Sequence, residues 1–247
     1  MNEIIALALV ILAGGMLLGL TVLQRRLTPV FREIKAFIRF KRAIGLSVED
    51  GTRLHLSLGR GGLQTAQSAS ALAGLGLLRH LAELTSVSDK PPLVTSGDGA
   101  LSILTGDTLK SGYKAAGAEE LYDPTTARLT GLSPFSYAAG AIPAIRDENV
   151  SLNVFIGHFG SEVALLADAA ERANSLTVAA ADEPAAQAVL FASVDEPLVG
   201  EELFAAGAYA GAGTAHQASL QMQDVLRWLI ILALLGASAL KLLEGVI

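Results

Sequence analysis

The hydrophobic pattern of the chain opens with a long uninterrupted apolar run. Ile4–Leu23 covers twenty residues without a charged side chain, and Arg25 and Arg26 follow it. As a helix this run would be about 30 Å long, which is the thickness of the hydrocarbon core of a bilayer. Only Glu3 carries a charged side chain before the run, so the basic start of a cleaved signal peptide is missing. The pattern predicts an uncleaved transmembrane helix over residues 1–24.

A second apolar segment ends the chain. Trp228–Leu240 is uncharged over thirteen residues, which is about 20 Å of helix and too short to span a bilayer alone. Continuing to Ile247 adds Lys241 and Glu244, which are three positions apart and can share a helix face. We predict a second transmembrane helix over residues 225–247. The alternative is a buried helix that packs on the first one or on a neighbouring copy.

Basic side chains gather directly after the first apolar run. Between Gln24 and Ile44 there are seven Lys or Arg residues and one acid, Glu33. The basic residues are Arg25, Arg26, Arg32, Lys35, Arg39, Lys41 and Arg42. Positive charge close to a membrane helix marks the cytoplasmic side. We therefore expect the N-terminus outside, the middle of the chain in the cytoplasm, and the lipid bilayer as a partner.

The basic segment itself, residues 25–50, has the pattern of an amphipathic helix and a linker. Thr28 and Pro29 suit the N-cap and the first helical position. The apolar residues that follow recur at spacings of three and four: Val30, Phe31, Ile34, Phe37 and Ile38. Such a helix could lie in the headgroup layer of a membrane. The alternative is a helix that packs its apolar stripe on its own domain or on a neighbouring subunit.

Between these segments, over residues 51–220, strand-like and helix-like stretches alternate. The predicted strands are Arg53–Leu58, Leu93–Thr95, Leu152–Ile156, Leu176–Ala180 and Val189–Val194. The predicted helices are Thr65–Leu84, Leu101–Ala116, a segment ending near Ala173, one beginning at Glu183, and Gly200–Ala210. Tyr122–Gly140 is rich in turn residues and has no clear period. The alternation predicts an α/β fold, a Rossmann-like layered domain with a mostly parallel sheet, flanked by N- and C-terminal transmembrane helices.

The middle of the chain also contains a faint internal echo. A strand, a Gly-x-x-Gly turn and a helix occur at Gly59 and Gly62, and again 98 residues later at Gly157 and Gly160. A duplicated half-domain would explain the echo. Chance is the alternative, because glycine and alanine matches are common in this composition.

Three glycine-rich turns follow predicted strands and are candidate ligand sites. They are Gly59-Arg60-Gly61-Gly62, Gly97-Asp98-Gly99 and Gly157-His158-Phe159-Gly160. In open α/β sheets such turns let backbone amides approach an anion such as a nucleotide phosphate. The first turn is not the dinucleotide fingerprint, because Gln64 stands where the third glycine would be. Tight turns need glycine for conformational reasons alone, and that is the alternative.

Four side chains near these turns could meet if the turns share one edge of the sheet. Arg60, Asp98, His158 and Glu162 would then supply a cation, two carboxylates and an imidazole for acid–base chemistry. The simpler reading is that Asp98 caps a helix, Glu162 faces a helix dipole and His158 is a surface residue. The sequence favours the simpler reading and offers no recognisable catalytic set.

Composition excludes several classes of function. The chain has no cysteine, so disulfides and thiolate metal sites are excluded. Its four histidines lack ligand spacing, and we predict neither a metal site nor a cofactor. The net charge of −6 argues against nucleic acid as a partner.

Small residues recur at a spacing of four in both apolar segments. They are Gly15 and Gly19 in the first, and Ala233 and Ala237 in the second. Such spacing permits close contact between helices in lipid. Copies anchored in one membrane are already oriented alike, so we expect copies of the chain itself as partners.

Three stretches carry a resemblance to a known family. They are Thr85–Leu101 (TSVSDKPPLVTSGDGAL), Gly131–Gly140 (GLSPFSYAAG) and Val199–Tyr209 (VGEELFAAGAY). They are similar to a family of bacterial membrane-anchored proteins that is labelled as a domain of unknown function. The resemblance extends over nearly the whole chain and implies an architecture at the bacterial inner membrane. It implies no activity and no functional residue.

The sequence leads to one main hypothesis on function. We expect a membrane-anchored, non-catalytic protein that assembles into a large homo-oligomeric scaffold or ring on the cytoplasmic face of the membrane. The alternative is a membrane-tethered module that binds a nucleotide or another anionic small ligand at the glycine-rich turns. An enzyme acting on a lipid-borne substrate is a third, weaker hypothesis.

Overall fold

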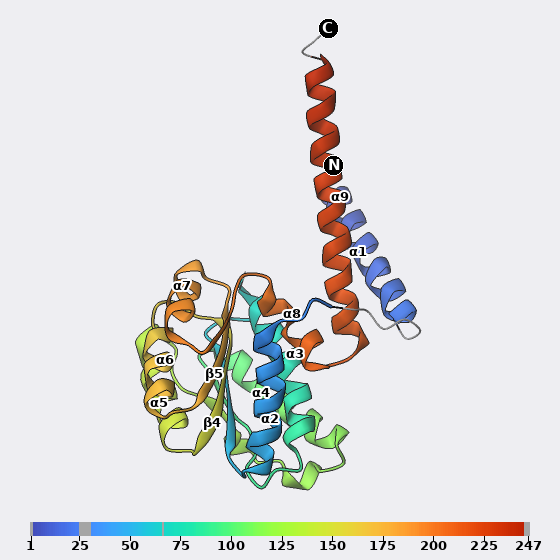
Figure 1. Ribbon diagram of the computed structural model, residues 1–247. Helices are drawn as coiled ribbons and strands as arrows, with labels where there is room; N and C mark the ends of the chain where they lie inside the picture. The colour runs from blue at the N-terminus through green and yellow to red at the C-terminus, as the bar shows by residue number, and fades with distance from the viewer. Residues whose placement is uncertain (1, 25–30, 66, 245–247) are drawn as a thin grey trace. The chain divides into compact units, whose positions relative to one another are not determined.

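The computed structural model describes residues 2–24, 31–65 and 67–244. The chain divides into two compact units. One contains the N-terminal segment up to Arg32 together with Gly213 to the C-terminus, and the other is Glu33–Ala212. Figure 1 shows both units.

The first unit pairs two helices from opposite ends of the chain. Helix α1 (Asn2–Gln24) lies against helix α9 (Thr214–Glu244). Helix α9 begins at Thr214 rather than near 225, so it takes in residues that we placed in the middle domain. Among the described residues, Thr214–Leu242 is the stretch long and apolar enough to cross a membrane, and Val10–Leu23 is a shorter apolar helix.

The second unit is built on a six-stranded sheet in which every neighbouring pair of strands is parallel. The strands are β1 (Arg53–Gly59), β2 (Leu93–Ser96), β3 (Ala127–Leu129), β4 (Val150–His158), β5 (Leu176–Ala181) and β6 (Glu196–Leu198). Their order is β3-β2-β1-β4-β5-β6. This is the order of a doubly wound sheet made of two βαβαβ halves. The prediction of an α/β domain with a mostly parallel sheet is confirmed.

Helices cover both faces of the sheet. They are α2 (Lys35–Glu49), α3 (Ser68–Thr85), α4 (Gly99–Ala115), α5 (Pro134–Arg146), α6 (Val163–Arg172), α7 (Pro184–Ser193) and α8 (Glu202–Ala210), with short 3-10 turns at Glu119–Leu121 and Pro124–Thr126. One apolar core lies between the sheet and α2, α3, α4 and α8. A second core lies between the sheet and α5, α6 and α7. A parallel sheet needs this cover because both of its faces are apolar.

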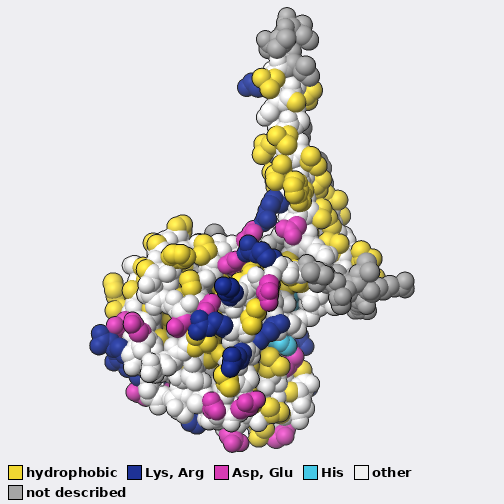
Figure 2. All heavy atoms as spheres, in the orientation of Figure 1, with side chains coloured by type: hydrophobic (Ala, Val, Ile, Leu, Met, Phe, Trp, Pro, Cys, Tyr) yellow, Lys and Arg dark blue, Asp and Glu magenta, His cyan; other side chains and the backbone are white. Residues whose placement is uncertain are grey.

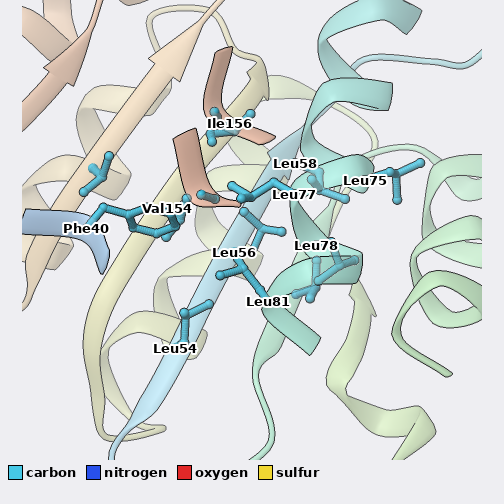
Figure 3. Close-up of a cluster of buried hydrophobic side chains, with 14 of the residues drawn as sticks. Phe40, Leu54, Leu56, Leu58, Leu75, Leu77, Leu78, Leu81, Val154 and Ile156 are labelled. Carbon is cyan, nitrogen blue, oxygen red and sulfur yellow. The ribbon is translucent and has the colours of Figure 1, made fainter. Parts of the chain in front are cut away.

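The larger core is built on the alternation of leucines in β1. Leu54, Leu56 and Leu58 are buried on the face that α3 covers. Figure 3 shows them beside the leucines of α3, among them Leu77 and Leu78. Alternate residues of a strand point to one face, which explains why every second position of β1 is a leucine.

Two predicted segments differ from the structure. Val189–Val194, predicted as a strand, belongs almost entirely to α7. Pro184 occupies the first helical position and starts this helix. Its buried side chains are Ala186 and Leu190, which are four positions apart, as one face of a helix requires. Tyr122–Gly140, predicted as turns, contains β3 and the start of α5. A capping box at Ser133 and the following proline begin α5.

The basic segment also differs in detail. Helix α2 begins at Lys35, after the non-helical residues 31–34, so the predicted start is wrong for the described part; Thr28 and Pro29 lie outside the described residues. Its apolar stripe, including Phe37 and Phe40, is buried in the core of its own domain. This is the packing that we had given as the alternative to a helix in the headgroup layer.

The leucines of α3 provide a test of the core. Leu78 is fully buried, whereas Leu72 on the same helix is 54% exposed. Leu78→Ala should lower the free energy of unfolding by about 2–5 kcal/mol, because it removes buried methyl groups and leaves a cavity. Leu72→Ala should change it by less than about 0.5 kcal/mol. Thermal or chemical unfolding of both variants checks this, and equal effects would contradict the described core.

Candidate functional site

The candidate site lies at the carboxyl ends of β1 and β4, where the strand order reverses. These two strands pair directly, with His55 opposite Asn153. In doubly wound sheets ligands bind at this switch point. The structure brings two of the predicted glycine-rich turns together here, since the Arg60 N–H donates to the His158 carbonyl at 2.9 Å. The third turn joins them through the Gly97 N–H, which donates to the Gly59 carbonyl at 2.8 Å.

An ion pair spans the switch point. Arg60 Nε donates to Glu162 Oε1 at 2.8 Å. The same carboxylate oxygen accepts the Gly160 N–H at 3.1 Å. Burial acts to raise the pKa of Glu162, but the hydrogen bonds from Gly160 and Arg60 outweigh it and hold the pKa below 4.5. Glu162 therefore stays ionised and ties the turn after β1 to the loop after β4.

His158 lies beside this ion pair and is held by a residue that the sequence analysis missed. Its Nδ1 is 2.8 Å from Asp182 Oδ1. The other oxygen of Asp182 accepts a hydrogen bond from Ser70 Oγ, in the first turn of α3, at 2.8 Å. Asp182 directly follows β5, so its position after a predicted strand was the signal that could have placed it at this edge.

Carboxylates also meet the helix N-termini at this edge. Asp98 is the N-cap of α4, and its Oδ1 accepts the Leu101 N–H at 2.8 Å. Glu183 occupies the N-cap position of α7. Glu162 occupies the N-cap position of α6, and Asp182 accepts the hydrogen bond from Ser70 in the first turn of α3. Positive helix ends that could attract a phosphate are therefore met by the protein's own carboxylates.

The charge balance of the edge follows from these contacts. Four carboxylates lie near one guanidinium and one imidazole, so the edge is acidic overall. The four residues that could converge do gather here, and Asp98 caps a helix as the simpler reading expects. Among the described residues, no group of three or more His, Asp or Glu is arranged to hold a metal ion. The arrangement is suited to locking two strand ends together.

The glycines of the three turns have different roles. A Cβ atom on Gly157 would lie 2.0 Å from the Leu58 carbonyl oxygen, and one on Gly59 would lie 2.2 Å from that of His158. Gly59 also has a φ of +68°, in the left-handed region. By contrast, a Cβ on Gly99 would meet nothing within 4 Å. The close approach of β1 and β4 thus explains Gly59 and Gly157 without a ligand.

Behind the edge, a row of buried polar side chains joined by hydrogen bonds crosses the sheet. Asn153 Nδ2 donates to Ser175 Oγ at 2.7 Å, and Asn153 Oδ1 lies 2.9 Å from His55 Nδ1. The other ring nitrogen of His55 lies 2.9 Å from Thr95 Oγ1. Tyr137 extends this row of hydrogen bonds, because its hydroxyl forms a hydrogen bond with the Ser57 hydroxyl and accepts the Gly59 N–H at 3.2 Å.

The donor and acceptor roles in this row of hydrogen bonds fix the tautomer of His55. Ser175 Oγ donates to the Ala170 carbonyl, so it accepts from Asn153 and turns the amide oxygen toward His55. His55 then carries its proton on Nδ1. Burial lowers the pKa of His55 to about 4, although the hydrogen bond to Asn153 acts in the opposite direction. The ring is therefore neutral at pH 7.

The small residues of the apolar helices are all exposed. Gly15 and Gly19 are exposed, and a Cβ on either would meet nothing within 4 Å. Ala233 and Ala237 are exposed as well. The structure does not bring these four residues together within one chain.

The second unit is thus a doubly wound α/β domain whose switch point is occupied by its own ion pair. Over residues 1–246 the chain matches the family described as "Domain of unknown function (DUF6754)", and it belongs to that family. This confirms the resemblance to an uncharacterised family. No curated protein and no solved structure matches the chain.

Glycine substitutions separate a packing role from a ligand role. Gly157→Ala should lower the free energy of unfolding by about 1–3 kcal/mol, because the new methyl group overlaps the backbone of β1. Gly99→Ala, in open space at the start of α4, should leave stability unchanged or slightly raise it. Thermal unfolding of both variants is the measurement. A neutral Gly157→Ala would disprove the close approach.

Acidification should weaken the fold through His55. The unfolded chain binds a proton on this residue near pH 6.5 and the folded chain only near pH 4, so stability is lost as the pH falls between these values. The loss is on the order of 3 kcal/mol for a shift from 6.5 to about 4. Below about pH 4.5 the Glu162 ion pair adds a further loss, because its lowered pKa is then approached.

Thermal unfolding between pH 7 and pH 4 measures this effect. His55→Gln, which cannot titrate, should flatten the profile above pH 4.5. A profile that His55→Gln leaves unchanged would contradict the assignment.

Proposed function

We propose that this chain is a membrane-anchored, non-catalytic protein that self-assembles into a homo-oligomeric scaffold on the cytoplasmic face of a bacterial inner membrane. The observation that carries the proposal is the exposure of apolar side chains along α1 and α9. Leu18 is 70% exposed and Leu234 is 64% exposed, although the two helices contact each other. These surfaces need an apolar environment.

The energetics favour a bilayer for both helices. Burying one large apolar side chain contributes about 1.5–3 kcal/mol, and many such side chains line the two helices. A bilayer core of about 30 Å would take the apolar part of α9 from Trp228 onward. Arg227 and Trp228 would then lie at the interface, where these residue types anchor helices. Helix α1, with the basic residues after it, supports an N-terminus outside.

The candidate site supports a non-catalytic role. The Arg60–Glu162 ion pair lies across the switch point, and carboxylates meet the neighbouring helix N-termini. A nucleotide phosphate would have to displace these carboxylates or lie against them. The geometry therefore weighs against the alternative of an anionic ligand at the glycine-rich turns.

The outward position of the small residues supports self-association. Gly15 and Gly19 are exposed, so this face of α1 is open to close approach by another helix in lipid. Copies with both helices in one bilayer would share an orientation. Lateral assembly would then need no reorientation.

Extraction and mass measurement test the proposal. The full chain should remain with membranes after lysis without detergent, and should appear in mild detergent as a particle of several copies. Gly15→Leu with Gly19→Leu should lower the copy number, because bulky side chains separate the helices. Gly14→Leu, on a different side of α1, is the matched control and should not. Recovery of the chain in the aqueous fraction, or a strictly monomeric particle, would overturn the proposal.

A further inference from the structure

A cavity lies at the amino edge of the sheet, at the opposite end of the strands from the switch point. It has a volume of about 500 Å³ and lies between the C-terminal ends of α6 and α7. Polar groups line much of it, including Glu171, Asn174, Ser175, Thr177, Ser193 and Asp195.

This cavity is suited to positive charge. Glu171 and Asp195 supply two carboxylates, and no Lys or Arg is among the lining residues. Asp195 accepts the Thr177 N–H at 2.9 Å, which fixes its carboxylate at the cavity wall. The C-terminal ends of two helices add their negative dipole ends. A guanidinium or ammonium group would be favoured here.

The chain carries a matching basic surface on the outer side of α2. Lys41 and Arg42 are exposed, and neither forms an ion pair with any residue that the structure describes. Figure 2 shows Lys and Arg side chains gathered over this helix. Ile38 is 49% exposed and Leu46 is 45% exposed, so the same surface is partly apolar.

The two surfaces lie close to the same edge strand, β6. Helix α2 reaches it through Arg39, which pairs with Glu196. The cavity reaches it through Asp195, the residue before Glu196. The cavity cannot receive the α2 helix of its own chain, because Phe37 and Phe40 hold α2 in the core on the opposite face of the sheet. A twofold arrangement lets each copy's basic helix meet the other copy's cavity.

Apolar contact would add to the charge complementarity. Phe191, on α7 beside the lining residue Ala192, is 70% exposed. Exposed aromatic residues next to polar groups are typical of protein interfaces. Ile38 and Leu46 of a second copy offer it apolar partners, which a small amine would not.

We infer that the outer side of α2, with Lys41 and Arg42, docks on the acidic cavity at Glu171 and Asp195 of a second copy of this chain. The inference rests on the proposed self-association and gives it a contact in the α/β domain. A free amine in the cavity is the competing occupant.

Cysteine cross-linking tests the contact directly, since the chain has no cysteine of its own. Full-length Arg42→Cys and Glu171→Cys proteins are mixed in one detergent sample and treated with a mild oxidant. A disulfide-linked dimer of the two variants is expected. Arg146→Cys, an exposed site on α5, should not link to Glu171→Cys. Equal linkage with Arg146→Cys, or none with Arg42→Cys, would overturn the inference.

Charge reversal gives a second, independent test. Glu171→Lys or Arg42→Glu alone should weaken association at least roughly tenfold, because like charges would face each other. The two changes together should restore much of it. Glu171 lies at the C-terminal end of α6, where lysine is well tolerated, so the variant should fold. Arg146→Glu is the control and should associate like the wild type.

The outcomes separate this inference from the function on which it rests. If the wild type is oligomeric and neither variant weakens its association, the α2 contact is wrong while the proposed scaffold is unaffected. A monomeric wild type would remove both. Unchanged association, with spermidine raising the thermal stability of the wild type but not of Glu171→Lys, would assign the cavity to an amine instead.

Discussion

The close approach of β1 and β4 is the constraint on which the α/β domain depends. At their carboxyl ends the two backbones come too near for any side chain, so Gly59 and Gly157 are required there. The Arg60–Glu162 ion pair then closes the same end, with Glu162 only 3% exposed. The two halves of the sheet, β3-β2-β1 and β4-β5-β6, meet at this pair of strands. At the position where other doubly wound sheets bind ligands, an ion pair joins the two halves.

This use of the switch point separates fold from function. A doubly wound sheet places helix N-termini and glycine turns at one edge, and many such domains bind phosphates there. In this chain Asp98 and Glu162 meet two of those N-termini with negative charge. The fold therefore has the architecture of a binding domain, and its edge carries the Arg60–Glu162 ion pair and the Asp98 cap.

The sequence predicted the fold better than the site. The alternation of leucines in β1 and the glycine turns were sufficient to place the central strands, because both signals are contained in a few neighbouring residues of the sequence. Residues 189–194 were predicted wrongly, since a short apolar run fits a strand or a helix equally well. The convergence of Arg60, His158 and Glu162 was foreseen as a possibility only. Asp182 could have been placed at this edge by its position directly after β5, whereas the partners of His55 depend on contacts between distant strands, which no local pattern encodes.

The pairing of His55 with Asn153 has a consequence for how this sheet finds its alignment. The core is made mostly of alanine, valine and leucine, which fit together in more than one way. A shift of one residue between β1 and β4 would break the hydrogen bond between His55 Nδ1 and Asn153 Oδ1 and leave these two atoms in the dry interior without each other as partners. The hydrogen bond between these two side chains therefore favours a single register of β1 and β4, much as one buried polar residue can set the pairing of otherwise uniform apolar helices.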